Sequence, residues 1–338
     1  MSVLGLVNII TPAYNSSYYI SRLLDSVLGQ SYPMIKMIVV DDGSTDNTRE
    51  IVEQYVSLFS NRGYVLLYVY QSNSGQSYAI NNALKLVDGE FLLWPDSDDW
   101  YKSPSAIEIM VNTMNSFGDE VGVARCRYEF VSGETQKSIR NNSYPKYGIP
   151  ECISDDAMYQ RNGFVWYPGG YIIKTKFLDR YIPNREIYAE KEAGQNFQLL
   201  FPYVVNSKCV SIDEVLFCYY VRKGSCSRPI TFENKNRKLE ARLRQYIYTL
   251  ESLSVLAPSK LEEYKNYAFR VIYMQLLGND IEYNEKKSFR RHLKVCRDLN
   301  IPLSRRYRRM DYWTRLFGIE SYRMIGKIHT NLKQFIRI

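Results

Sequence analysis

Residue types that build zinc sites and disulfide frameworks are scarce in this sequence. Its 338 residues include six cysteines and two histidines. No two cysteines form a C-x-x-C pair. This pattern argues against a structural zinc site and favours free thiols in a reducing compartment.

Long hydrophobic runs and two common nucleotide-binding fingerprints are also absent. No stretch of about 18 apolar residues occurs, so we expect no membrane-spanning helix. Residues 1–8 carry no basic segment and no cleavage-site pattern, so we expect no signal peptide. There is no G-x-G-x-x-G after the first predicted strand and no G-x-x-x-x-G-K-[ST] anywhere. A nucleotide site in this chain would therefore rely on a metal ion for its phosphates.

Charge is distributed unevenly along the chain. The net charge is +8, and residues 286–338 alone contain 15 Lys and Arg but 3 Asp and Glu. Residues 1–285 contain 29 basic and 33 acidic residues. Such an excess at one end suggests a polyanionic partner, which is an anionic membrane surface or nucleic acid. No nucleic-acid-binding motif is visible and the acidic part would repel a polyanion, so we expect no nucleic-acid partner.

Hydrophobic periodicity predicts strands that alternate with helices over the first 128 residues. Short apolar runs predict buried strands at 3–10, 35–40, 64–70, 91–94 and 121–128. Apolar positions at helical spacing between these runs predict helices. The alternation is typical of βαβ units, with a mostly parallel sheet and right-handed crossovers.

Three carboxylates, Asp96, Asp98 and Asp99, stand at the end of the fourth predicted strand. Like charges this close repel each other and are costly to desolvate unless something positive sits among them. A divalent cation is the usual solution, but the stretch is also rich in turn residues, so a simple polar turn is the alternative. The polar loops 11–15 and 41–46 also follow strands, and all three are expected at one edge of the sheet.

Four motifs occur here in order, and together they resemble glycosyltransferase family 2. They are Val7-Asn8-Ile9-Ile10-Thr11-Pro12-Ala13-Tyr14-Asn15, Val39-Val40-Asp41-Asp42-Gly43-Ser44-Thr45-Asp46, Asn73-Ser74-Gly75-Gln76, and Asp88-Gly89-Glu90-Phe91 through Asp96-Ser97-Asp98-Asp99. The resemblance covers residues 1–128, continues more loosely to about 228 and is silent beyond. It implies an α/β fold of the GT-A type, with a Rossmann-like, mostly parallel central sheet flanked by helices.

The resemblance also implies roles for particular residues. The residues implied to bind the nucleotide sugar are Pro12, Ala13, Tyr14, Asn15, Asp42, Asn73, Gly75, Gln76, Asp96 and Ser97. Asp42 would accept a hydrogen bond from the base, although Asp-Gly after a strand is also a plain turn. Asp96 and Asp98, with Asp99 adjacent, match the D-x-D motif that holds Mn²⁺ or Mg²⁺ on the diphosphate.

The general base is less clear from the sequence. An inverting transferase needs a carboxylate that takes the proton of the acceptor hydroxyl. Many members of the family use the Asp of a Gly-Glu-Asp, where this chain has Gly194-Gln195-Asn196. Amides cannot act as bases, so Glu192 and then Glu190 are the candidates, on a helix expected over 186–200. Acids in the first turn of such a helix would also favour its dipole without any catalytic role, and Asp155 or Asp156 could serve instead.

The second half of the expected catalytic domain is described mainly by composition. Residues 129–170 are rich in Asn, Tyr, Ser, Gly and Pro and are expected to form an irregular region near the acceptor. The aromatic stretch 166–171 is equally suited to stacking on sugar rings and to filling the core. Arg222, followed by Gly224-Ser225-Cys226-Ser227, resembles a late family pattern and could approach the diphosphate, or could lie in a solvated turn.

Domain boundaries follow from these patterns. We expect a catalytic domain over 1–228, divided into a nucleotide-sugar half (1–128) and an acceptor half (129–228), and a helical basic extension over 229–338. The extension ends with Arg305-Arg306-Tyr307-Arg308-Arg309 and an apolar set. That set is Trp313, Leu316, Phe317, Ile319, Tyr322, Ile325, Ile328, Leu332, Phe335 and Ile336. The combination favours a helix that lies on an anionic membrane, with a packed helix and a solvated basic face as the alternative.

These patterns together predict a metal-dependent, inverting transferase of the hexosyl or N-acetylhexosaminyl type. It would move a sugar from a nucleotide diphosphate, with UDP as the first candidate, to a saccharide or lipid-linked saccharide acceptor in surface-polysaccharide synthesis. The expected location is cytoplasmic, on the inner face of the membrane. Two rivals remain: transfer to a polyprenyl phosphate, which needs no base, and a nucleotide-sugar-binding protein without turnover.

Overall fold

The structure is a computed structural model that describes residues 2–222 and 231–317. Contacts divide the chain into two compact units. The first comprises Met1–Cys226 with Tyr248–Ala257, and the second comprises Ser227–Ile247 with Pro258–Ile338. The predicted boundary of the catalytic domain at residue 228 stays a prediction.

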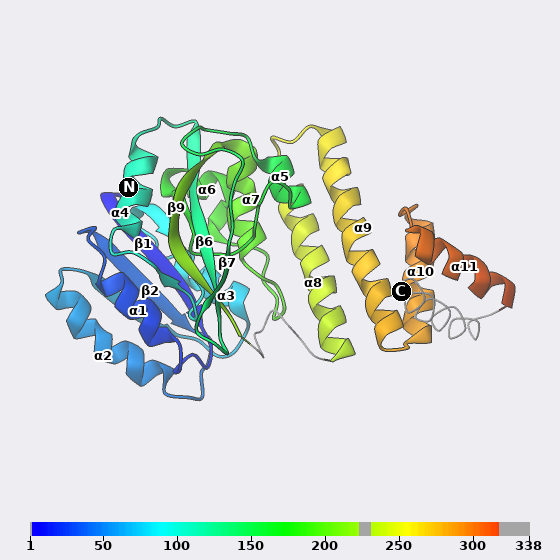
Figure 1. The fold of residues 1–338 in the computed structure, drawn as a ribbon, viewed down its shortest axis with the longest axis horizontal. Coiled ribbons are helices and arrows are strands. Elements are labelled where there is room, and N and C mark those ends of the chain that lie inside the picture. Colours follow the sequence, from blue (N-terminus) through cyan, green and yellow to red (C-terminus); the bar gives the residue numbers. More distant parts are fainter. Residues whose placement is uncertain (1, 223–230, 318–338) are drawn as a thin grey trace. The chain divides into compact units, whose positions relative to one another are not determined.

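A single twisted sheet forms the centre of the first unit (Figure 1). Within the described residues its order is β3-β2-β1-β4-β8-β6-β9-β5, and β7 pairs with β6. The strands are β1 Val3–Ala13, β2 Ile35–Asp41, β3 Val65–Tyr70, β4 Gly89–Leu93, β5 Trp100–Tyr101, β6 Val121–Ser132, β7 Ser138–Asn141, β8 Tyr171–Lys174 and β9 Lys208–Val221. Strands β3, β2, β1 and β4 are parallel, whereas β8 runs antiparallel to both β4 and β6.

Helices in the connections cover this sheet. They are α1 Ile20–Leu28, α2 Thr48–Asn61, α3 Gln76–Leu84, α4 Ala106–Asn115, α5 Ser154–Tyr159, α6 Leu178–Tyr181 and α7 Asn196–Asn206, with short 3-10 turns η1 Thr175–Phe177 and η2 Pro183–Arg185. On α1, Ile20, Leu23, Leu24 and Val27 are buried, as the helical spacing predicts. The central strands are apolar on both faces because helices cover both faces of a parallel sheet. The alternating elements expected over the first 128 residues are therefore present.

Two expectations for the second half of this unit are wrong. The stretch 129–170 is only partly irregular, because β6 continues to Ser132 and pairs with β7, and α5 follows. The helix expected over 186–200 begins only at Asn196. Residues 187–195 instead form an irregular segment, because side chains of α3 bind its backbone. Asn81 of α3 bonds the N–H and the C=O of Ile187 at 2.9 and 3.0 Å.

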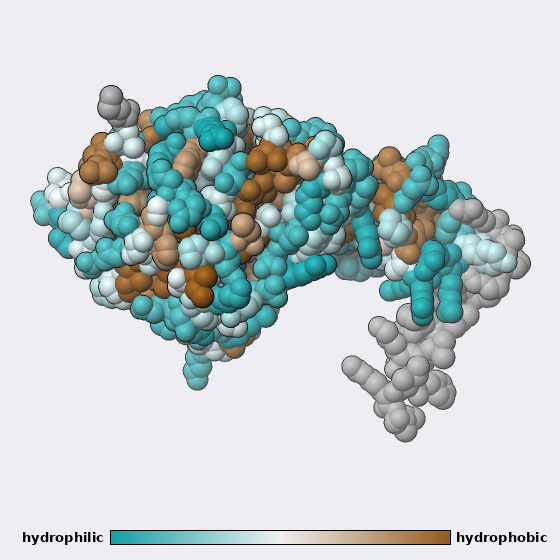
Figure 2. Space-filling model, turned by 90° about the horizontal axis from the view of Figure 1, so that it is seen from above, coloured by the Kyte–Doolittle hydropathy of each residue, from teal (hydrophilic) through white to brown (hydrophobic). Residues whose placement is uncertain are grey.

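The second unit is helical. Its helices are α8 Phe232–Glu251, whose last residues belong to the first unit, α9 Pro258–Glu282, α10 Lys286–Asp298 and α11 Arg305–Phe317. Leu277 of α9, Phe289, Leu293 and Cys296 of α10, and Met310 of α11 share one buried cluster. Hydrophilic side chains, drawn teal, are prominent over this unit in Figure 2. Within the described ranges, every helix is too short or too polar to cross a lipid bilayer.

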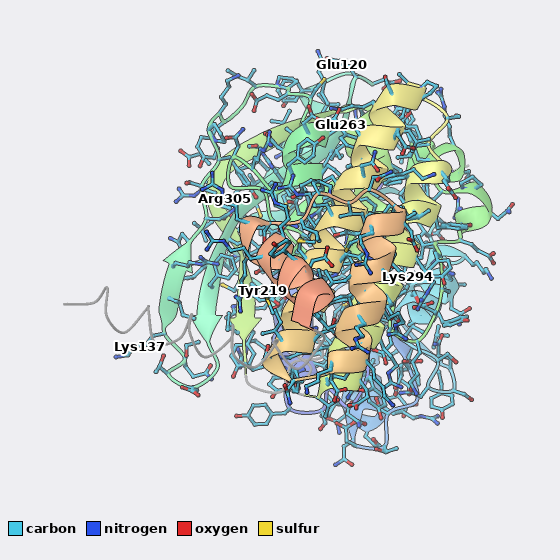
Figure 3. The ribbon with its side chains drawn as sticks, turned by 90° about the vertical axis from the view of Figure 1, so that its right-hand side faces the viewer. Glu120, Lys137, Tyr219, Glu263, Lys294 and Arg305 are labelled. Carbon is cyan, nitrogen blue, oxygen red and sulfur yellow. The ribbon has the colours of Figure 1, made fainter. Side chains whose placement is uncertain are left out.

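The basic segment predicted to meet a membrane lies partly in this unit. Arg305, Arg306, Arg308 and Arg309 are exposed on α11, whereas Tyr307 packs against the buried cluster. Figure 3 labels Lys294 on α10 and Arg305 at the start of α11. The side chains of the apolar set that begins at Trp313 lie outside the described residues. The described part of α11 thus has one packed face and one solvated basic face.

Candidate functional site

The three polar loops meet at one edge of the sheet, as the parallel strands predict. The N–H of Asp42 donates to the carbonyl of Ala13 at 2.8 Å, which joins the ends of β1 and β2. The N–H of Asn15 donates to the Ser44 hydroxyl at 2.9 Å. The hydroxyls of Ser16 and Ser97 lie 2.8 Å apart and join the first loop to the acidic loop. The structure therefore brings all three predicted loops together.

Asn15 and Tyr14 occupy the first of these loops. Asn15 has a φ of 47°, and its side-chain carbonyl accepts from the N–H of Thr45 at 2.8 Å. The ring of Tyr14 is 47% exposed, whereas Ala13 is buried at the end of β1. An exposed ring at the edge where the loops meet can stack on a planar ligand group.

Asp42 organises the loop before α3. Its carboxylate accepts from the N–H of Ser74 at 2.7 Å, the N–H of Gly75 at 2.8 Å and the Gln71 side chain at 2.8 Å. Asp42 is 5% exposed. The Asp42 carboxylate thus holds the loop that contains Asn73 and Gly75. This structural role differs from that of a residue in a plain Asp-Gly turn.

Asp96 lies among amide side chains. Its Oδ1 accepts from Gln76 Nε2 at 3.0 Å and from Gln195 Nε2 at 3.1 Å. Burial and the neighbouring Asp98 carboxylate raise the pKa of Asp96 to about 7. A carboxyl group with this environment gains from a nearby cation, because the cation favours its charged form.

The other two acids have different partners. Asp98 Oδ2 accepts from Arg222 Nε at 2.8 Å, and the guanidinium lies 4.6 Å from the centre of the Tyr19 ring. Asp99 is fully buried, and its Oδ1 accepts from the N–H of Tyr220 on β9 at 2.8 Å. Burial and the two neighbouring carboxylates raise the pKa of Asp99 well above its usual range. Asp99 therefore fastens the acidic loop to the sheet, and its predicted role as a metal ligand stays a prediction.

The donor set fits a divalent cation only in part. Across the residues that the structure describes, no three acidic, His or Cys side chains are arranged to share a metal ion. Mg²⁺ and Mn²⁺ in nucleotide sites need only one or two carboxylates, with phosphates and water as the other ligands. Asp96 and Asp98 supply two carboxylates of that kind, and the Asp98 carboxylate is paired with Arg222.

The segment 187–195 passes the start of α3 and carries the two candidate bases. Ser77 Oγ bonds both the carbonyl and the N–H of Glu190, at 3.0 and 3.2 Å. A side chain at Gly75, where φ is 111°, would come within 2.7 Å of the Lys191 carbonyl. Gln195 then reaches Asp96. Glu192 thus follows Lys191, which packs on Gly75, and precedes Gln195, which bonds Asp96.

Glu190 has a polar partner of its own, and the alternative acids lie elsewhere. The Tyr188 hydroxyl donates to the Glu190 carboxylate at 2.7 Å. Asp155 and Asp156 lie in the first turn of α5, and Asp156 accepts from the Asn162 side chain at 2.9 Å. Neither candidate base is a first-turn acid of α7, because that helix begins after them.

The aromatic stretch 166–171 is divided between two environments. Trp166 is half-buried and packs against Phe197 and Phe201 of α7, with ring centres 5.1 and 6.3 Å apart. The ring centre of Tyr167 instead lies 4.1 Å from that of Tyr219 on β9. Figure 3 labels Tyr219. Burial and the charges of Asp99, Asp96 and Asp98 raise the pKa of Tyr219, so its ring borders the acidic cluster.

Sequence reasoning missed two contacts of this site. Gln195 was noted only as an amide where an acid is usual, yet it bonds Asp96. The sequence predicts no site role for Ser16, yet its hydroxyl pairs with that of Ser97. The Gln195 signal was its position within a family motif, whereas nothing in the sequence pointed to Ser16.

Comparison with known proteins defines the class. The family model described as "Glycosyl transferase family 2" matches residues 8–176, and the chain belongs to this family. This match confirms the family expected from the four motifs.

Two curated relatives illustrate the sequence similarity. Glycosyltransferase GlyA of Streptococcus pneumoniae is 28% identical over 66% of this chain and 31% of its own length. The putative teichuronic acid biosynthesis glycosyltransferase TuaG of Bacillus subtilis is 44% identical over 29% of this chain and 37% of its own length. The chain thus spans about a third of the length of these relatives.

Two solved structures illustrate the similarity of fold. S. aureus TarS 1-349 in complex with UDP-GlcNAc has a TM-score of 0.70 at 19% identity, and the match covers 96% of this chain and 92% of that one. The mannosyltransferase PcManGT from Pyrobaculum calidifontis, in complex with GDP-Man and Mn²⁺, has a TM-score of 0.51 at 15% identity, with 95% and 86% covered. These matches confirm the predicted GT-A fold.

Proposed function

We propose that this protein is a metal-dependent, inverting glycosyltransferase that takes a sugar from a UDP-sugar and adds it to a saccharide or lipid-linked saccharide. The observation that carries the proposal is the acidic pair Asp96 and Asp98 at the sheet edge where three strand-end loops meet. Ligands of open α/β sheets bind at this edge. The similar TarS structures are complexes with UDP-GlcNAc and with UDP, which favours a uridine nucleotide here.

Asp98 and Asp96 would hold Mn²⁺ or Mg²⁺ against the diphosphate. When bound, the cation would neutralise the charge that develops on the leaving diphosphate. Arg222 is bonded to Asp98 and supplies a second positive charge at the same place. Loss of the Asp98 contact would free its guanidinium to pair with a phosphate oxygen, as the late family pattern suggests. The Mn²⁺ named for PcManGT supports divalent metal use in this fold.

Asp42 and Tyr14 are proposed to bind the nucleoside. The Asp42 carboxylate accepts three hydrogen bonds from the protein, and its two oxygens have room for one more from the base. Tyr14 offers an exposed ring at the same edge. The loops bound to Asp42 and Asp96 supply the rest of the proposed nucleotide-sugar set, which is Pro12, Ala13, Asn15, Asn73, Gly75, Gln76, Asp96 and Ser97.

The reaction needs a proton acceptor near the acceptor hydroxyl. The hydroxyl oxygen bonds to the anomeric carbon as the bond from that carbon to the diphosphate oxygen breaks, and the base takes the hydroxyl proton. Glu192 is the first candidate because contacts on both sides of it fix its segment against Gly75 and Asp96. Glu190 is the second, since the Tyr188 hydroxyl orients its carboxylate.

Transfer to a polyprenyl phosphate is the second candidate function. That acceptor is already an anion, so it needs no base. The observation in its favour is that Gln195 and Asn196 are amides, and that Gln195 is bonded to Asp96 instead of facing an acceptor hydroxyl. A nucleotide-sugar-binding protein without turnover is disfavoured. The carboxylates of Asp96 and Asp98 repel each other, and a site without catalysis does not need such a pair of metal ligands.

The biological setting is also proposed. The teichuronic acid pathway named for TuaG supports a role in cell-surface polysaccharide synthesis. The exposed arginines of α11 support attachment to the inner, anionic face of a membrane, where a lipid-linked acceptor lies. The proposed location is cytoplasmic and peripheral to that membrane.

A donor screen tests the proposed function. Purified protein is incubated with a panel of UDP-, GDP- and dTDP-sugars, with Mn²⁺, Mg²⁺ or EDTA, and release of the nucleoside diphosphate is measured. We expect release from at least one UDP-sugar with metal, none with EDTA, and a rise when the acceptor is added. Release that is equally fast in EDTA would contradict metal dependence, and binding without any release would favour the non-catalytic alternative.

A further inference from the structure

A groove lies on the first unit beside α3, away from the acidic cluster. Its main hollow has a volume of about 350 Å³, within the range of small-ligand sites. A second hollow of about 130 Å³ adjoins it and shares Glu186, Ile187 and Tyr248 with it. The two adjoining hollows, together called the groove, lie between α3, the start of segment 187–195 and the last residues of α8.

One face of α3 forms the first wall. Tyr78, Asn81, Asn82 and Lys85 are spaced three and four residues apart, so they share a face of the helix. The opposite face, with Ile80 and Leu84 among its members, is buried against the sheet. The wall extends for about 10 Å from Tyr78 to Lys85 at 1.5 Å per residue.

Contacts within the protein fix the shape of the groove. Asn81 bonds both backbone groups of Ile187, which joins the first wall to the second. Tyr188 packs on Tyr248 with ring centres 5.5 Å apart, which joins the second wall to the end of α8. The groove is therefore formed before any ligand enters, and a preformed site loses less entropy on binding.

The chemistry of the lining matches a sugar. Tyr78 and Tyr248 line the groove and are 43% and 51% exposed, so part of each aromatic side chain is accessible to a ligand. Lys85 and Glu186 pair at 3.0 Å, so the charges at the rim cancel each other. Flat apolar faces, amides and a neutral charge balance favour an uncharged ligand rich in hydroxyl groups.

The groove shares both of its walls with the proposed active site. The first turn of α3 also carries Gln76, which bonds Asp96. The second wall carries Tyr188, whose hydroxyl bonds the candidate base Glu190 at 2.7 Å. A chain that extends from the reaction centre along α3 would pass Tyr78, which follows Gln76 on that helix.

We propose that this groove binds uncharged sugar units of the acceptor chain at a distance from the reaction centre. The inference rests on the proposed function for the class of its ligand. Such a subsite would make the enzyme prefer an acceptor already several units long. Binding there does not involve the metal or the donor, because neither Asp96 nor Asp98 lines the groove.

Binding to an array of uncharged bacterial surface oligosaccharides tests the proposal. The full-length protein is applied in EDTA without donor, as wild type, Tyr78→Ala/Tyr248→Ala and Asp98→Asn. We expect binding by wild type and Asp98→Asn, and at least about tenfold weaker binding by the double alanine variant, the effect of one lost aromatic contact. Tyr78→Phe/Tyr248→Phe keeps both rings and should bind nearly as well as wild type.

Tyr312→Ala is the matched control, because Tyr312 is 59% exposed and lies on α11 in the other unit. It should bind like wild type, and circular dichroism should show that each variant is folded. The proposal is overturned if wild type binds no uncharged oligosaccharide. It is also overturned if the double alanine variant binds as tightly as wild type, or if Asp98→Asn loses binding. Release of nucleoside diphosphate without oligosaccharide binding would contradict this inference and leave the proposed function intact. Oligosaccharide binding without release would contradict the proposed function and leave the groove as a binding site.

Discussion

Three neighbouring aspartates illustrate how single residues at one site acquire different roles. Asp98 is paired with Arg222, Asp96 is bonded by two glutamine amides, and Asp99 is buried against the backbone of β9. Each partner offsets part of the mutual repulsion of the carboxylates. At the residue scale, Asp96 and Asp98 of the D-x-D motif are bonded by side chains, whereas the adjacent Asp99 anchors the loop to β9.

Asp42 allows a prediction at this scale. If its carboxylate also bonds the base of the donor, Asp42→Ala should raise KM for the donor more than it lowers kcat, because the contact is the same in ground and transition states. Steady-state kinetics over a range of donor concentrations measure both constants. Gln71→Ala is the matched control, since it removes one loop contact and keeps the carboxylate. A defect in kcat alone, or an equal rise in KM in both variants, would refute the base contact.

The motifs identified these residues, but not all of their partners. Strand-end loops can be located from the sequence because apolar runs and turn residues mark where each strand ends. The bond from Gln195 to Asp96 could not be predicted, because it joins residues 99 positions apart. Contacts of that kind depend on how an irregular segment crosses the sheet edge, and no local pattern encodes them.

At the scale of elements, the strands and helices of the nucleotide half follow their sequence patterns closely. Their apolar runs are long and separated by clear turns, so local preference and tertiary packing agree. The predicted helix over 186–200 failed because tertiary contacts prevail over periodicity there. Asn81 and Ser77 of α3 bond the backbone of residues 187–190, which leaves the helix to begin at Asn196.

Gly75 gives a test of this packing between elements. A methyl group there would meet the Lys191 carbonyl at 2.7 Å, and φ is 111°. Gly75→Ala should therefore lower the free energy of unfolding by about 1–3 kcal/mol, the scale of a strained backbone, and should raise KM for the donor. Gly194→Ala, in the same crossing segment, meets no atom within 4 Å and serves as the control. Urea unfolding of both variants measures the difference, and equal stability would contradict the tight contact.

At the scale of the whole molecule, net charge separates the two ends of the chain. Residues 286–338 contain 15 basic and 3 acidic residues. The described part of α11 shows four exposed arginines, while Tyr307 and Met310 pack inside the helical unit. Deleting this helix would open that core, so exchange of surface charges is the better experiment.

The variant Arg305→Gln/Arg306→Gln/Arg308→Gln/Arg309→Gln tests membrane attachment. Each basic residue near an anionic surface contributes about 1 kcal/mol of attraction, which salt screens over about 8–10 Å. Wild type should sediment with anionic vesicles, less so as salt rises, and the variant should bind clearly less while keeping nucleoside diphosphate release. If wild type ignores anionic vesicles, or binds neutral ones equally well, the basic face of α11 is only a solvated surface.

Metal-dependent binding of UDP tests the central claim most directly. Isothermal titration of the full-length protein with UDP is performed in Mn²⁺, in Mg²⁺ and in EDTA, for wild type, Asp98→Asn and Glu192→Gln. We predict that EDTA and Asp98→Asn each weaken UDP binding by at least about tenfold, the effect of 1.4 kcal/mol, while Glu192→Gln binds UDP like wild type because its carboxylate acts only on the acceptor. UDP binding of equal affinity in EDTA, or in Asp98→Asn with metal, would contradict the assignment of Asp96 and Asp98 to the metal site.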